Sequence, residues 1–205
     1  PKRTQPPWLV VMLGVFVVLT LIIGAMWWIG TLYHGQPSAP ATGTGEIPQQ
    51  ADRALIDRLP ALPGQPHPRS STVSAGKGAE LELYEPETAK IFAAHQIREV
   101  TWQGASDGST VYTVLVAEAP SAASASATTA DLVRLTRPVF DKVAPIGGDR
   151  AMHSYRQLTA HSHSYRVLYT SGVHAVRIDV ARSPAGDSDA LEAVFSGVTQ
   201  VLPPG

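Results

Sequence analysis

An uncharged apolar run limits most strongly what this chain can fold into. It covers residues 8–30 and is long enough, as a helix, to cross about 30 Å of hydrocarbon. Indole and phenol rings favour the level of the lipid headgroups, and such residues stand near both ends of the run. The sequence therefore predicts a transmembrane helix over 8–30. The expected membrane-interface residues are Trp8, Trp27, Trp28 and Tyr33.

The charges on either side of the run predict its orientation. Lys2 and Arg3 precede it, and the next charged residue is Glu46. Positive charge is retained on the cytoplasmic side, so residues 1–7 are expected in the cytoplasm and the rest beyond the plasma (inner) membrane, on the periplasmic side. A cleaved signal peptide is the alternative. Its apolar core would be about 7–15 residues long, which favours an uncleaved anchor here.

Small residues within the run indicate where another helix could pack. Gly14, Thr20 and Gly24 are the candidates, and Thr20 and Gly24 form one small-xxx-small pair. Small side chains at that spacing allow two helices to approach closely. The same spacing also arises by chance, so a plain anchor and a helix-packing surface both remain open.

The chain after the anchor predicts an α+β domain. Residues 31–46 are rich in Gly, Pro, Ser and Thr, which is typical of a flexible linker. The extracytoplasmic domain is expected over 47–205, as an antiparallel sheet with helices on one face. The predicted helices lie near 55–59 and over 85–96, 128–144 and 188–202. The predicted strands are 97–104, 109–119, 164–170 and 173–182, with turns at 106–108 and 171–172 and a loop over 60–78.

Side-chain patterns refine these elements. In the helices, hydrophobic spacing places Ala89, Phe92 and Ala93 inward, then Leu132, Leu135, Val139 and Val143, and finally Leu191, Val194, Phe195 and Val198. Pro138 is expected to kink or split its helix, because proline lacks a backbone donor. Alternation in the last two strands predicts one apolar face, made by Tyr165, Val167, Tyr169, His174, Val176, Ile178 and Val180.

Composition excludes several classes of function. The chain has no cysteine, which excludes a disulfide framework and thiol catalysis. Its formal net charge of −1 gives no basic face for nucleic acid.

The stretch AMHSYRQLTAHSHSYRVLY contains His153, His161 and His163 and repeats His-Ser-Tyr-Arg. On one strand, His161 and His163 would point the same way, as two metal ligands could. A zinc site needs at least a third ligand, and no cysteine is present to supply it. The prediction is a polar strand start that contacts a partner or titrates near pH 6–7, without a metal. The two tyrosines of the repeat are expected to be half-buried and its arginines solvated.

Catalytic motifs are weak. Ser74 and Lys77 match S-x-x-K, the acylating motif of penicillin-binding enzymes, but K-T-G is absent and Ser106-Asp107 is followed by Gly. The carboxylates over 80–87 are interpreted as a solvated approach to a helix. No enzyme activity, cofactor or metal is expected.

The layout of basic N-terminus, Trp-flanked anchor, Ala/Pro/Thr/Gly spacer and cysteine-free outer domain resembles small single-pass actinobacterial envelope proteins. It is most similar to LucB, the accessory subunit of Mce-type lipid-uptake transporters; accessory subunits of the respiratory supercomplex come next. The resemblance implies a non-enzymatic subunit that stabilises or regulates a larger membrane complex for lipid or fatty-acid transport. Its partners would be the bilayer and an integral membrane protein, contacted by the anchor and the outer domain. It assigns no functional residues. The alternative is a ligand-binding or sensor module with an apolar pocket between sheet and helices.

Overall fold

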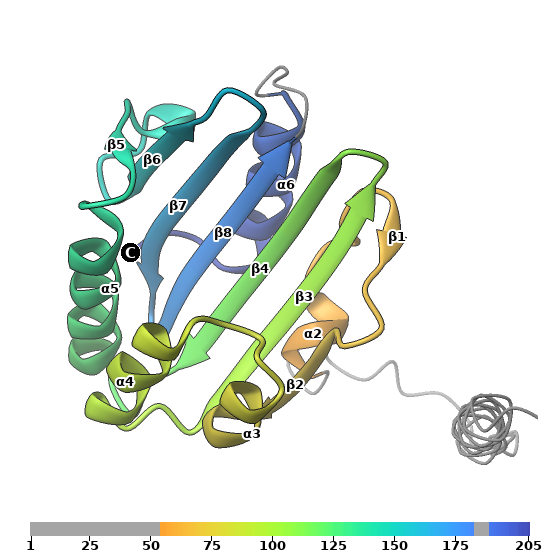
Figure 1. The fold of residues 1–205 in the computed structure, drawn as a ribbon. Helices are drawn as coiled ribbons and strands as arrows, with labels where there is room; N and C mark the ends of the chain where they lie inside the picture. Colours follow the sequence, from red (N-terminus) through yellow and green to blue (C-terminus); the bar gives the residue numbers. More distant parts are fainter. Residues whose placement is uncertain (1–53, 183–188) are drawn as a thin grey trace, which may run out of the picture. The chain divides into compact units, whose positions relative to one another are not determined.

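The computed structural model describes residues 54–182 and 189–205. Their strands form one antiparallel sheet of eight strands in the order β1-β3-β4-β8-β7-β6-β5, with β2 also paired to β3 (Figure 1). The sheet and its helices confirm the α+β class. The strands are β1 (Gln65–Pro66), β2 (Ser71–Ser74), β3 (Glu99–Asp107), β4 (Thr110–Glu118), β5 (Asp141–Lys142), β6 (His153–Leu158), β7 (His163–Ser171) and β8 (His174–Arg182).

Two long hairpins form the centre of the sheet and join through β4 and β8, where Val114 lies opposite Ile178. Both hairpins turn later than the sequence predicted: the first turn is at 108–109 and begins two positions later, and the second is at 172–173 and begins one position later. Gly108 and Gly172 have φ of 56° and 55°. Glycine reaches this left-handed region without a steric cost, so each turn begins at its glycine and the preceding residue stays in the strand.

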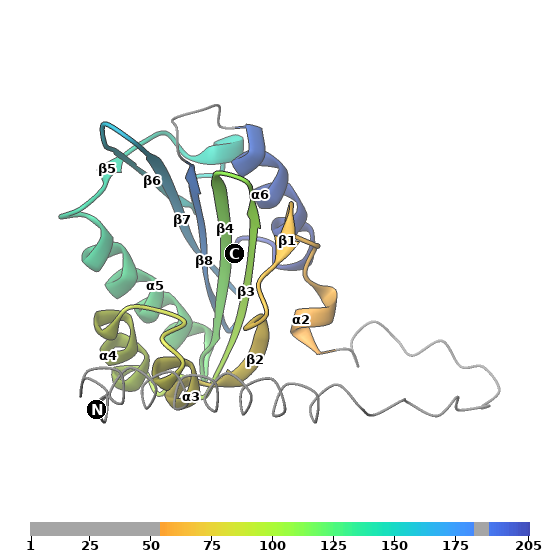
Figure 2. The same cartoon turned by 45° about the vertical axis from the view of Figure 1, so that its right-hand side comes forward.

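Helices cover both faces of the sheet, so the expectation of helices on one face was wrong. Figure 2 shows α3 (Ala75–Glu80), α4 (Pro86–Ala94) and α5 (Ala122–Thr136) on one side, and α2 (Leu55–Arg58) and α6 (Asp189–Val201) on the other. We call these sides the α4/α5 face and the α6 face. Adjacent strand residues point to opposite faces, and Val167 and Leu168 are both fully buried.

The core on the α6 face follows the predicted alternation. It contains Val167, Tyr169, Val176, Ile178 and Val180 from the sheet, with Tyr165 packed against it. From α6 it contains Val194, Phe195 and Val198, which were predicted to point inward. The buried phenol of Tyr169 donates a hydrogen bond to the carbonyl of Leu202 at 3.1 Å. This bond ties the end of α6 to the middle of the sheet.

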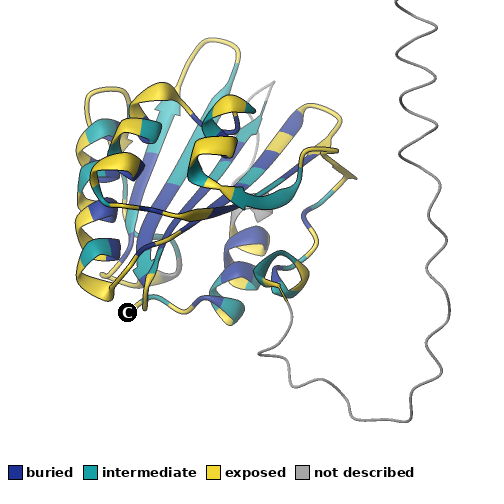
Figure 3. Ribbon diagram, turned by 90° about the horizontal axis from the view of Figure 1, so that it is seen from below, coloured by how far each residue is buried: buried dark blue, intermediate teal, exposed yellow. Residues whose placement is uncertain are grey.

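Helix α5, on the α4/α5 face, differs more from the prediction. Helix α5 begins at Ala122, six residues earlier than expected, because Ser121 caps it by accepting a hydrogen bond from the amide of Ser124. The helix ends at Thr136, ahead of Pro138, as the missing proline donor requires. Val139, predicted to point inward, is therefore exposed. In Figure 3 the buried colour runs along the strands, and the outer sides of the helices are exposed.

The region predicted as a loop over 60–78 contains β1, β2 and the first four residues of α3. Prolines in this region suggested a loop, but Pro66 lies in β1 at the edge of the sheet, where a missing donor is tolerated. In α4, Phe92 is buried as predicted. Ala93 is exposed, and Thr88 fills the inward position instead.

Within residues 54–182 and 189–205, no helix is long and apolar enough to cross a membrane. The predicted anchor over 8–30, its interface and helix-packing residues, and the predicted linker over 31–46 all lie outside the described residues.

Candidate functional site

The three histidines His153, His161 and His163 do not come together. His153 starts β6 on the α4/α5 face, opposite Leu168, whereas His163 starts β7 on the α6 face, opposite Leu158. They therefore stand at opposite ends of the β6–β7 pair. His161 lies in the turn before β7, so the expectation that it shares a strand face with His163 was wrong. Among the described residues, no group of three His, Asp or Glu side chains could hold a metal ion.

The two His-Ser-Tyr-Arg segments pair with each other across β6 and β7. Tyr155 lies opposite Arg166, and Arg156 lies opposite Tyr165. Tyr155 is 1% exposed and belongs to the core of the α4/α5 face. The side chain of Arg166, expected in solvent, is only 13% exposed. The second copy of the repeat thus places Arg166 on the α4/α5 face, where its side chain is largely buried.

The S-x-x-K motif is used as a helix cap. The hydroxyl of Ser74 accepts a hydrogen bond from the backbone amide of Lys77 at 3.3 Å, at the start of α3. The ammonium of Lys77 forms an ion pair with Glu80 at 2.9 Å. These contacts give both residues a structural role at the start of α3.

A cluster of charged side chains lies on the α4/α5 face, where β7 and β8 meet. Arg166 and Asp179 are paired directly across the two strands, and Arg177 precedes Asp179 by two residues, so all three point to this face. The Nε atoms of both arginines donate to Asp179 at 2.6 Å, each to a different carboxylate oxygen. Asp179 therefore bridges the two guanidinium groups.

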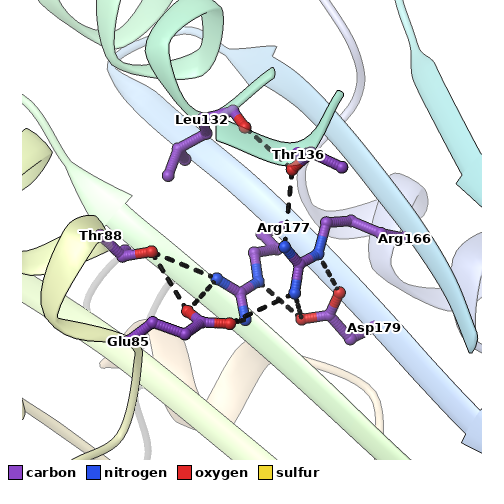
Figure 4. Close-up of polar contacts among 7 residues, drawn as sticks. All are labelled: Glu85, Thr88, Leu132, Thr136, Arg166, Arg177 and Asp179. Carbon is purple, nitrogen blue, oxygen red and sulfur yellow. Dashed lines mark hydrogen bonds and ion pairs between the residues drawn. The ribbon is translucent and has the colours of Figure 1, made fainter. Parts of the chain in front are cut away.

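Glu85 brings a second carboxylate to the cluster from α4. It is the N-cap residue of α4, but its side chain makes no capping hydrogen bond. It accepts two hydrogen bonds from Arg177, at 2.7 and 2.8 Å, and a longer one from Arg166 at 3.4 Å (Figure 4). Thr88 donates to the same carboxylate at 3.1 Å. The two parallel hydrogen bonds from Arg177 to Glu85 hold the start of α4 against the sheet.

Electrostatics hold this cluster in its charged form. Burial raises the pKa of Glu85, but hydrogen bonds and charge from Arg177, with the charge of Arg166, outweigh burial and lower it to about 2. Burial alone would lower the pKa of Arg177; the charges and hydrogen bonds of Asp179 and Glu85 overcome this and raise it above the ordinary arginine value. Two carboxylates and two arginines thus neutralise one another at the sheet surface.

The remaining contacts of Arg166 lie towards α5. Its guanidinium carbon is 4.9 Å from the centroid of the Phe140 ring, and it makes a long contact of 3.5 Å to the hydroxyl of Thr136. A cavity of about 240 Å³ adjoins this arginine, between Glu85 and the end of α5.

A larger cleft lies on the other side of Glu85, beneath the segment that joins α3 to α4. Its volume is about 660 Å³. Arg177, Asp179 and Trp102 line it from the strands, and Glu82 and Glu85 line it from the α3–α4 segment. The apolar lining comes from Ala79, Leu83, Pro86 and Ala89.

Two local features shape this cleft. A Cβ atom at Gly104 would come within 2.4 Å of the Trp102 ring, so a residue without a side chain lets the indole lie over the strand. Glu82 has a φ of 53° because it follows α3 in a left-handed C-terminal motif: its amide donates to Ala79 and that of Leu83 to Gly78. Glycine is the usual residue at that position.

Sequence patterns did not predict this cluster: Glu85 and Arg166 were expected in solvent, and Arg177 and Asp179 were not singled out. One signal was present: the strand segment VRIDVAR alternates apolar residues with opposite charges two positions apart. Such a pattern is typical of a strand with one solvent-facing side. Only the helices on that side show that the charges are covered.

No family model matches this chain, and no curated protein matches it. Among solved structures, it is similar to the extracellular domain of PknH from Mycobacterium tuberculosis. The identity is 11% and the TM-score 0.45, over 67% of this chain and 82% of that chain.

Proposed function

We propose that this chain is a non-enzymatic, single-pass membrane protein whose extracytoplasmic domain binds a small ligand in the cleft beneath the α3–α4 segment. The cleft itself carries the proposal. Its volume of about 660 Å³ lies within the range of roughly 300–1,000 Å³ that is usual for small-molecule sites. Its lining joins apolar side chains to a few charged ones, as such sites do.

The state of the charged residues supports binding rather than catalysis. A general acid or base works best with a pKa near the working pH, whereas the pKa of Glu85 is lowered to about 2. Arg177 uses its Nε and both terminal nitrogens in contacts with Asp179 and Glu85. The cluster supplies a rigid wall that positions α4 and the cleft together.

A cavity-filling variant tests this function. Ala89 lines the cleft, and Ala93 lies one turn later on the same helix and is exposed. Ligand-observed NMR of the full chain in nonionic detergent, against a library of small organic fragments, should give fragments that bind the wild type and Ala93→Phe but not Ala89→Phe. Fragments that bind all three proteins equally, or no binding fragments at all, would contradict the proposal.

The accessory-subunit hypothesis stays a prediction of the sequence. It rests on the resemblance to LucB and on residues outside the described ranges, and it is compatible with a ligand-binding outer domain. Native mass spectrometry of a tagged full chain, purified in mild detergent, should retain a larger integral membrane partner. Recovery of free monomer alone would count against it.

A further inference from the structure

The cleft carries one carboxylate that forms no ion pair with an arginine in the described part of the chain, although the guanidinium of Arg69 donates to the carbonyl of Leu81 next to it at 2.9 Å. Three carboxylates line it, from Glu82, Glu85 and Asp179. The last two are paired with Arg166 and Arg177. No ion pair joins Glu82 to another residue in the described part of the chain, and its side chain is exposed. The unpaired charge therefore stands at the α3–α4 side of the cleft.

Glu82 lines the cleft in a backbone conformation that is unfavourable for residues other than glycine. The position after α3 is left-handed, which favours glycine, yet a carboxylate occupies it. Gln96 occupies the equivalent position after α4, with a φ of 56°, and does not line the cleft. The two residues share a backbone conformation and differ in their place relative to the cleft, so Gln96 provides a matched control.

Apart from Thr113, the rest of the lining is aromatic or aliphatic. The ring of Trp102 lies over Gly104, and the wall also includes Ala79, Leu83, Tyr84, Pro86 and Ala89. An indole ring attracts cations electrostatically. An anion would be repelled by Glu82, and the guanidinium of Arg177 already donates to Glu85 at 2.7 and 2.8 Å.

We infer that the ligand of this cleft is an organic cation with an apolar body, such as a substituted ammonium compound, bound through the Glu82 carboxylate beside Trp102. The inference rests on the proposed ligand-binding function and adds the chemical class of the ligand. The apolar body occupies the cleft wall, and the positive group compensates the one unpaired charge.

Three probes of similar size test the sign of the charge. Benzyltrimethylammonium, benzyl alcohol and benzenesulfonate are titrated separately into the full chain in nonionic detergent, and binding is followed by ligand-observed NMR. We expect the cation to bind about tenfold more tightly than the alcohol. The sulfonate should bind most weakly.

Variants at position 82 then localise the effect. Glu82→Gln removes the charge and keeps the backbone conformation, and should reduce cation binding to the level of the alcohol. Glu82→Gly should do the same, whereas Gln96→Gly should bind like the wild type. Equal binding of cation and sulfonate, or cation binding that survives Glu82→Gln, overturns the inference. If fragments bind the wild type and Ala93→Phe but not Ala89→Phe, the cleft is still a ligand-binding site even when the cation does not bind preferentially. The inference about the ligand class can therefore fail while the proposed function stands.

Discussion

Neutralising Glu85 should destabilise the domain at neutral pH and change how its stability responds to acid. Glu85→Gln keeps the shape of the side chain but removes the charge that compensates Arg177, which is 8% exposed. An arginine buried without its full complement of partners is costly.

A carboxyl whose pKa falls from 4.5 to about 2 on folding contributes at most about 3.4 kcal/mol, at roughly 1.36 kcal/mol per pH unit. The side chain of Glu85 is 46% exposed, so solvent screens part of this interaction. We therefore expect Glu85→Gln to lower the free energy of unfolding at pH 7 by about 1–2 kcal/mol.

The sign of the pH dependence follows from the lowered pKa. The folded state binds the Glu85 proton more weakly than the unfolded state. The stabilisation is therefore complete above about pH 4.5 and is lost as the pH falls towards about 2. Over that window the wild type should lose more stability than Glu85→Gln, so the difference between the two proteins should shrink.

Urea unfolding of the full chain in nonionic detergent, followed by circular dichroism at pH 7, 4.5 and 2.5, measures both effects. Glu87→Gln is the control, because Glu87 lies in the first turn of α4, is exposed, and makes no ion pair within the described residues. Its effect should stay below about 0.5 kcal/mol. Equal stability of the wild type and Glu85→Gln at pH 7, or parallel loss of stability in acid, would refute the reasoning.

Four further substitutions test local features by the same urea assay. Glu82→Gly and Gln96→Gly should each raise the free energy of unfolding by about 0.5–1 kcal/mol, because glycine relieves the left-handed backbone; a decrease at both sites would contradict the assigned motif. Gly104→Ala should lower it by about 1–3 kcal/mol and shift the indole NMR signal that Trp102→Phe removes, because the new Cβ would lie 2.4 Å from that ring; an unmoved signal would count against the close approach. Ser121→Ala should lower it by about 1 kcal/mol through loss of the α5 cap, and an unchanged value would show that the cap contributes nothing.

Local patterns predicted much of the framework because they report short-range geometry. Alternation in 173–182 identified Val176, Ile178 and Val180 as one strand face, and hydrophobic spacing identified the inner side of α6. The small-residue start of α5 was missed, because Ala and Ser in this stretch supply little hydrophobic period to distinguish a helix from a loop. Its serine cap was the available signal.

The histidines show the opposite error. A two-residue spacing puts side chains on one face only when both residues lie within a strand. His161 lies in the turn before β7, so the rule did not apply to it. The three histidines are close together in the sequence, but the pairing of β6 with β7 places His153 and His163 at opposite ends of these two strands.

The sequence by itself determined the class of fold, the two central hairpins and the apolar face that packs on α6, because each depends on residues close together in the chain. It also predicts the anchor over 8–30. Only the tertiary structure decided that the charged face of β7 and β8 is covered as well. Glu85 reaches Arg177 across 92 positions of sequence, and no local period encodes a contact of that range. The cleft exists because that ion pair and the turn at Glu82 hold the α3–α4 segment over Trp102.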